Sequence, residues 1–134
     1  MAHTFTFVTS RFRRDDEPLN PINPIGGQAA LLWLTEQLAI AGFECGAPDA
    51  EDWGWYTHVL SGGRAYLLGV SGEWDDGAAD TEWTVQLELR RSLWDRVTGA
   101  NKLLEGDSVS LSVERTLRSA SDIRTVSVDR VGGD

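Results

Sequence analysis

The alternation of side chains over residues 82–91 is the feature that most constrains what this chain of 134 residues can fold into. Every second position is apolar and the positions between are polar: Trp83, Val85, Leu87 and Leu89 alternate with Thr84, Gln86, Glu88 and Arg90. A period of two places successive side chains on opposite faces of a strand. One buried face and one solvent-exposed face are typical of an antiparallel sheet. We therefore expect a sheet that buries one of its faces.

Four other segments have strand signals: residues 3–12, 53–60, 64–71 and 123–130. In the first of them, Phe5 and Phe7 alternate with threonines, which is again the pattern of a half-buried strand. A Ser-Gly-Gly sequence at 61–63 predicts a hairpin-like turn. The short connections that follow predict that three successive strands form an antiparallel meander.

Residues 28–41 predict a helix that follows two glycines and ends at Gly42. This helix is apolar on nearly all sides, because Leu32, Trp33 and Ile40 interrupt its polar side. Such a helix is buried on more than one side. Either it lies between the sheet and a second layer, or its edge from Trp33 to Ile40 meets another subunit, which makes a homodimer the alternative.

Two shorter helices are expected toward the C-terminus. Ser92 predicts the N-cap of a helix over residues 93–98. Residues 108–119 fit two patterns, since their apolar residues alternate with serines as in a strand but also recur at helical spacing. Asp107 is a good N-cap, and this favours the helix.

The order of these elements is β-α-β-β-β-α-α-β. It predicts one α+β domain over residues 1–134, with a frayed C-terminus at 131–134. The expected architecture is a single-layer, mainly antiparallel sheet of about five strands with helices packed on it.

Charge is distributed unevenly along the chain. Residues 15–89 contain fourteen acidic residues and one basic residue, Arg64, and the whole chain has a net charge of −9. Nucleic acid is not an expected partner of such a surface, because phosphate binding requires Lys and Arg. An acidic surface favours encounter with a basic protein. The same charge can also serve solubility alone.

Tryptophans accompany this acidic segment. Trp53 and Trp55 are expected on one face of their strand, either in the core or as a stacking platform. Residues 73–83 place five carboxylates between or beside Trp74 and Trp83. In a partner-binding loop, the rings would anchor the partner and the carboxylates would steer its basic surface toward the loop. The alternative is a solvated turn. Their spacing is not that of an EF-hand, and no metal is expected.

No catalytic residue and no cofactor is predicted, and the chain is expected not to be an enzyme. Cys45 has no basic neighbour that would lower its pKa, and the two glycines before the first helix lack the lysine and the spacing of a phosphate-binding loop. A lone cysteine fits a reducing compartment, and no apolar stretch is long enough to span a bilayer. We expect a cytoplasmic protein without membrane contact.

Two functional hypotheses follow. The first is an inhibitor-like or immunity-like module that masks a basic partner surface, with a binding set of Trp53, Trp55, Trp74, Asp75, Asp76, Asp80, Glu82 and Trp83. The second is a small-molecule or carbohydrate-binding domain, with or without catalysis, whose pocket holds two or more tryptophans and one carboxylate.

Overall fold

The alternating segment is a central strand of an antiparallel sheet in the computed structural model, which describes residues 2–75 and 77–130. This strand, β6 (Thr81–Leu89), pairs with β1 (Ala2–Thr9) on one side and with β5 (Arg64–Gly72) on the other. Beyond β1 lies β7 (Arg124–Asp129). Beyond β5 lies β4 (Gly54–Ser61), which also pairs with the short β2 (Glu44–Cys45) and β3 (Asp49–Glu51).

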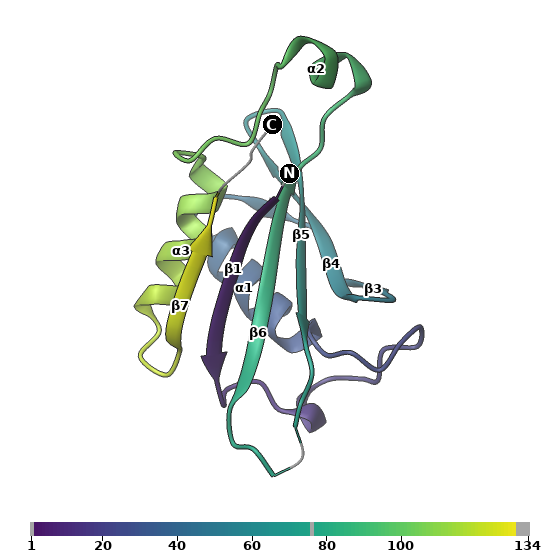
Figure 1. Cartoon of the computed structure of the whole chain (residues 1–134), viewed down its shortest axis with the longest axis vertical. Coiled ribbons are helices and arrows are strands. Elements are labelled where there is room, and N and C mark those ends of the chain that lie inside the picture. The colour runs from purple at the N-terminus through teal and green to yellow at the C-terminus, as the bar shows by residue number, and fades with distance from the viewer. Residues whose placement is uncertain (1, 76, 131–134) are drawn as a thin grey trace.

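The described residues of this α+β fold also form three α-helices: α1 (Gln28–Ile40), α2 (Leu93–Thr98) and α3 (Ser108–Ser119). A short 3-10 turn, η1 (Arg14–Asp16), follows β1. Both long helices, α1 and α3, lie behind the sheet in Figure 1 and bury their apolar residues against it. None of the helices in the described ranges is long and apolar enough to cross a membrane.

The predicted elements are confirmed, and the residues at 108–119 form a helix, not a strand. The prediction of about five strands is too low, because the described sheet has seven. The two that were missed, β2 and β3, lie between the predicted helix at 28–41 and the predicted strand at 53–60. Strands of two and three residues are too short to show a period. The expected frayed end at 131–134 lies outside the described residues.

The sheet has one covered face and one open face. Alternate residues of the long strands point at the helices and are buried, including Phe5, Leu68 and Val85. The residues between them, such as Thr6, Leu67 and Gln86, lie on the opposite face, which no described helix covers. We call this second surface the open face.

Residues 90–106 leave the end of β6 and form a projecting segment, which we call the α2 arm (Figure 1). The helix within it has no buried residue. Its N-terminus is closed by a capping box between Ser92 and Asp95, and its C-terminus by Gly99 in the left-handed conformation. Arg91 donates to the carbonyl oxygens of Asp95 and Ala100, which fixes the shape of the arm.

Candidate functional site

Two of the tryptophans predicted to bind a partner lie in the core. Trp83 is fully buried and Trp55 is 6% exposed, because both belong to the alternating positions that face the helices. Trp83 does not lie on the surface where the partner-binding hypothesis placed it, and Trp55 occupies the core, which is one of the two positions expected for it. Their burial corrects the expected anchor set, and Trp83 instead supports Trp74 from below, with ring centroids 5.5 Å apart.

Trp53 and Trp55 lie on opposite faces of the sheet, contrary to the expectation from strand alternation. Trp53 precedes β4, and Gly54 between the two tryptophans has a φ of 150°, a conformation that interrupts the extended strand. The Trp53 ring lies over Gly69 on the open face, where a side chain at Gly69 would collide with it. Trp53 is therefore a half-buried ring with the backbone of β5 beneath it, 6.4 Å from the ring of Tyr56.

Trp74 is half-buried at the junction of two segments that are distant in sequence. Its indole Nε1–H donates to the carbonyl oxygen of Phe12 at 2.9 Å, and Arg14 donates to the Trp74 carbonyl oxygen at 3.2 Å. The guanidinium of Arg14 also lies over the Trp74 ring, 5.9 Å from its centroid. These contacts hold η1 against the loop between β5 and β6.

This junction brings together acidic residues that the sequence separates. We call the group the acidic end, and its described members are Asp15, Asp16, Glu73, Asp75, Asp80 and Glu82. Asp80 forms an ion pair with Arg124. In the described part of the chain, Asp15, Glu73, Asp75 and Glu82 have no ion-pair partner, and all four are exposed. Asp76, predicted for the same surface, lies outside the described residues.

A hollow of about 450 Å³ opens beside Trp74. Its apolar lining comes from Pro18, Leu19, Pro24, Ile25 and Trp74. Two carboxylates, Glu17 and Glu73, and the guanidinium group of Arg14 also border it. Glu17 is occupied, since its carboxylate accepts the backbone N–H groups of Gly27, Gln28 and Ala29 at 2.9–3.2 Å. The backbone N–H groups at the start of α1 are therefore not free to bind an anion. No local sequence pattern predicted that a residue ten positions upstream would cap this helix.

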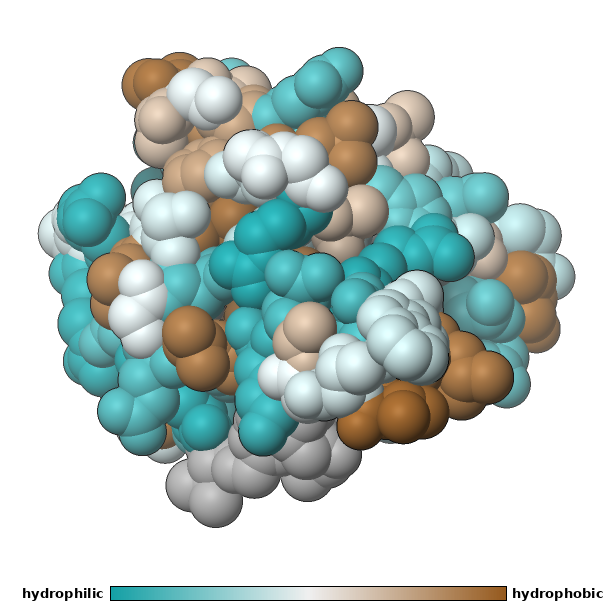
Figure 2. Space-filling view, turned by 90° about the horizontal axis from the view of Figure 1, so that it is seen from above, coloured by the Kyte–Doolittle hydropathy of each residue, from teal (hydrophilic) through white to brown (hydrophobic). Residues whose placement is uncertain are grey.

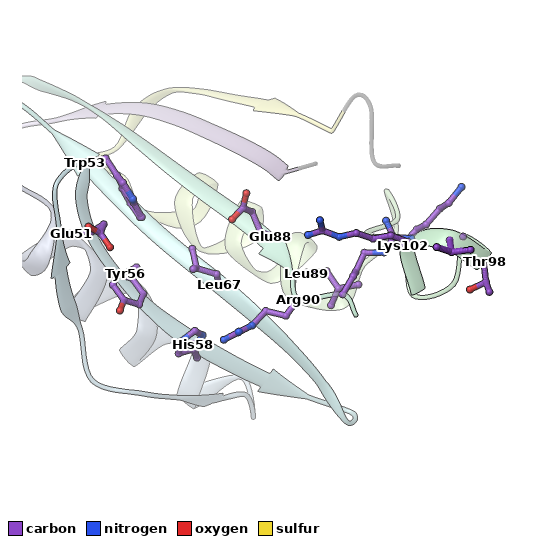
Figure 3. Close-up of a pocket in the computed structure, with 14 residues that line it drawn as sticks. Glu51, Trp53, Tyr56, His58, Leu67, Glu88, Leu89, Arg90, Thr98 and Lys102 are labelled. Atoms are coloured by element: carbon purple, nitrogen blue, oxygen red, sulfur yellow. The ribbon is translucent and has the colours of Figure 1, made fainter. Parts of the chain in front are cut away.

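A larger hollow, about 1000 Å³, lies between the open face and the α2 arm (Figure 3). The sheet contributes Glu51, Trp53, Tyr56, His58, Leu67 and Glu88 to its lining. The arm contributes the cations Arg90, Arg91, Arg96 and Lys102. We call this hollow the basic groove. No sequence pattern predicted this groove, because its two walls come from segments that only the fold brings together.

The edge of α1 from Trp33 to Ile40, which was predicted to meet another subunit, is partly covered by residues of the same chain. Trp33 is half-buried against Phe12, with ring centroids 5.7 Å apart, and Arg11 lies over its ring. Ile40 remains 78% exposed. The segment after β1 thus covers one end of the edge, and the homodimer stays a prediction.

The described residues contain no cluster of three or more His, Cys, Asp or Glu that could hold a metal ion. Cys45 is half-buried, and this burial raises the pKa of its thiol. A raised pKa disfavours the thiolate and hence nucleophilic attack.

No family model matches this chain, and no curated protein and no solved structure is significantly similar to it.

Proposed function

We propose that this chain is a non-catalytic binding protein whose acidic end masks a basic surface of a protein partner. The observation that carries the proposal is the convergence of carboxylates from η1 and from the β5–β6 loop around the half-buried Trp74. Unpaired carboxylates that lie on one surface create a negative electrostatic potential there. Such a field accelerates encounter with a cationic surface.

The hollow beside Trp74 supplies the apolar contact that a charged surface alone lacks. Leu19 at its rim is 77% exposed, and Glu73 lies in the same lining. The long stem of a lysine or arginine of the partner fits such a place, with its charged head near Glu73. Trp74 is the anchor in this arrangement, and its ring is positioned by the bond to Phe12 and by Trp83 beneath it.

The alternative hypothesis, a tryptophan-lined ligand pocket, is supported less well. It predicts two or more tryptophans in one hollow. Each of the two hollows described here contains one, Trp74 in the smaller and Trp53 in the larger. This distribution favours the partner-binding proposal.

The test is affinity capture from the source lysate at low salt with three forms of the immobilised chain. These are the wild type, a variant with Glu73→Lys and Asp75→Lys, and a control with Glu36→Lys and Glu105→Lys. The control makes the same change in net charge at exposed sites outside the acidic end. We expect a basic protein that binds the wild type and the control, elutes as salt is raised, and binds the test variant at least about tenfold more weakly. Equal retention by all three forms, or binding that salt does not affect, would refute the proposal.

A further inference from the structure

The α2 arm gives this acidic protein a second surface of opposite sign. Four cations of the arm line the basic groove, against the two carboxylates Glu51 and Glu88 from the sheet. Within the described ranges, the side chains of Arg90, Arg96 and Lys102 have no ion-pair partner. These three unpaired cations outnumber the two carboxylates of the groove and repel one another, so an anionic ligand would be stabilised beside them.

Capping interactions, a hydrogen bond to the sheet and a buried leucine fix the position of the α2 arm, which forms one wall of the groove. Both ends of α2 are capped, and Arg64 donates to the carbonyl oxygen of Lys102 at 3.0 Å, where the arm returns to the sheet. Leu103 is buried at the same point. On the helix itself, however, Leu93 is 80% and Trp94 is 72% exposed. In Figure 2, which looks onto this end of the molecule, apolar and strongly polar residues lie side by side. A capped helix with large exposed apolar residues is typical of an interaction surface.

The aromatic rings of the groove lie at one end of it, and its cations lie toward the other end. Figure 3 shows Trp53 and Tyr56 at one end and Lys102 at the other, with Leu67 and Glu88 between them. Trp53 covers Gly69, which pairs with Gln86, and Arg90 follows Gln86 by four residues. At about 3.3 Å per residue, the aromatic platform and Arg90 are about 13 Å apart. A ligand that uses both must be elongated.

We propose that the basic groove binds an extended acidic peptide segment of a protein partner, with an apolar or aromatic side chain on Trp53 and carboxylates at Arg90, Arg96 and Lys102. Four or five extended residues span the required distance. This site is separate from the acidic end and does not depend on the function proposed for it.

The carboxylates of the groove favour a peptide over a nucleic acid. A polynucleotide carries a phosphate at every step, and a strand that runs from the arm to Trp53 passes Glu88. A peptide can place a neutral residue there. The net charge of −9 adds repulsion against a uniform polyanion.

The test is fluorescence anisotropy with a labelled ten-residue peptide that contains four glutamates and two phenylalanines in a Ser/Gly background. We expect saturable binding that weakens as salt is raised, and that is absent for the same peptide with lysines in place of the glutamates. Arg96→Glu with Lys102→Glu should weaken binding about tenfold. Trp53→Ala should weaken it without changing its salt dependence. The control, Arg13→Glu with Arg115→Glu, makes the same change in net charge at exposed sites outside the groove and should bind as the wild type does.

All of these residues except Trp53 are exposed, and a thermal melt by circular dichroism verifies that each variant is folded. Three outcomes would overturn the proposal. The first is absence of peptide binding or an equal loss in the control. The second is tighter binding of a ten-residue oligothymidylate than of the peptide. The third is salt-sensitive self-association of the wild type that the groove variant abolishes, because the acidic end of a second copy would then be the occupant.

Discussion

His3 is a buried imidazole that connects β1 to α3. Its Nδ1 lies 2.7 Å from the Ser110 hydroxyl oxygen, and its Nε2 has no hydrogen-bond partner within the described structure. Burial, and secondarily the charge of Arg130, lowers the pKa of His3 below its ordinary value of 6.5, while Asp107, Glu105 and Asp129 oppose this shift. The folded chain therefore holds His3 neutral at pH values where an unfolded chain binds a proton.

The lowered pKa predicts that the chain loses stability as the pH falls below about 6.5. In that range the unfolded state binds more protons than the folded state, so the free energy of unfolding decreases; above it the contribution of His3 is fully present. Urea unfolding at about pH 7.5 and pH 5.5 measures the loss, and His3→Gln should reduce it. If the variant and the wild type lose equal stability over this interval, another group is responsible.

Asp107 connects the N-terminus of α3 to β5. Its carboxylate accepts the Ser110 N–H at 3.0 Å, the Tyr66 hydroxyl at 2.7 Å and the Arg64 guanidinium at 3.3 Å. Removal of this carboxylate leaves a helix without its cap and a buried hydroxyl without an acceptor. We expect Asp107→Ala to cost about 2–4 kcal/mol in unfolding free energy, and Tyr66→Phe about 1 kcal/mol. An equal cost of the two substitutions in urea unfolding would contradict this account.

At the scale of elements, α1 depends on a cap that is not adjacent to it in sequence. Gly27, at the N-cap, has a φ of 151° and no side chain to accept the first N–H groups of the helix. The Glu17 carboxylate accepts three of them. Glu17→Ala should therefore lower the unfolding free energy by about 1–2 kcal/mol, whereas Asp15→Ala, at an exposed neighbouring site, should change it by less than about 0.5 kcal/mol. Chemical denaturation of both variants checks this difference.

Local patterns predicted the helices and the long strands, because caps, turns and periods are properties of adjacent residues. They did not predict which face Trp53 occupies, since the unusual φ of Gly54 interrupts the alternation. They also did not predict that α2 projects from the fold. The Ser92 cap defines where that helix begins, but it contains no information about what packs against the helix.

At the scale of the whole molecule, composition predicted acidity but not its arrangement. Residues near 15 and near 75 form one surface because Arg14 and Phe12 both contact Trp74, which no spacing in the sequence reveals. The cations of the α2 arm lie at the opposite end of β6 from the β5–β6 loop. The two ends of the molecule thus have opposite charge, and the candidate sites differ accordingly.

The concentration of unpaired carboxylates predicts that salt stabilises the fold. Like charges held close together destabilise the compact state, and ions screen this repulsion. Raising NaCl from about 20 mM to about 500 mM should increase the unfolding free energy by about 1 kcal/mol. In the variant with Glu73→Lys and Asp75→Lys the increase should be smaller, because attraction to Asp15 replaces part of the repulsion. The control with Glu36→Lys and Glu105→Lys makes the net charge less negative by the same amount but leaves the acidic end intact. If both variants lose the salt effect to the same extent, total charge governs it, and the local field at the acidic end does not.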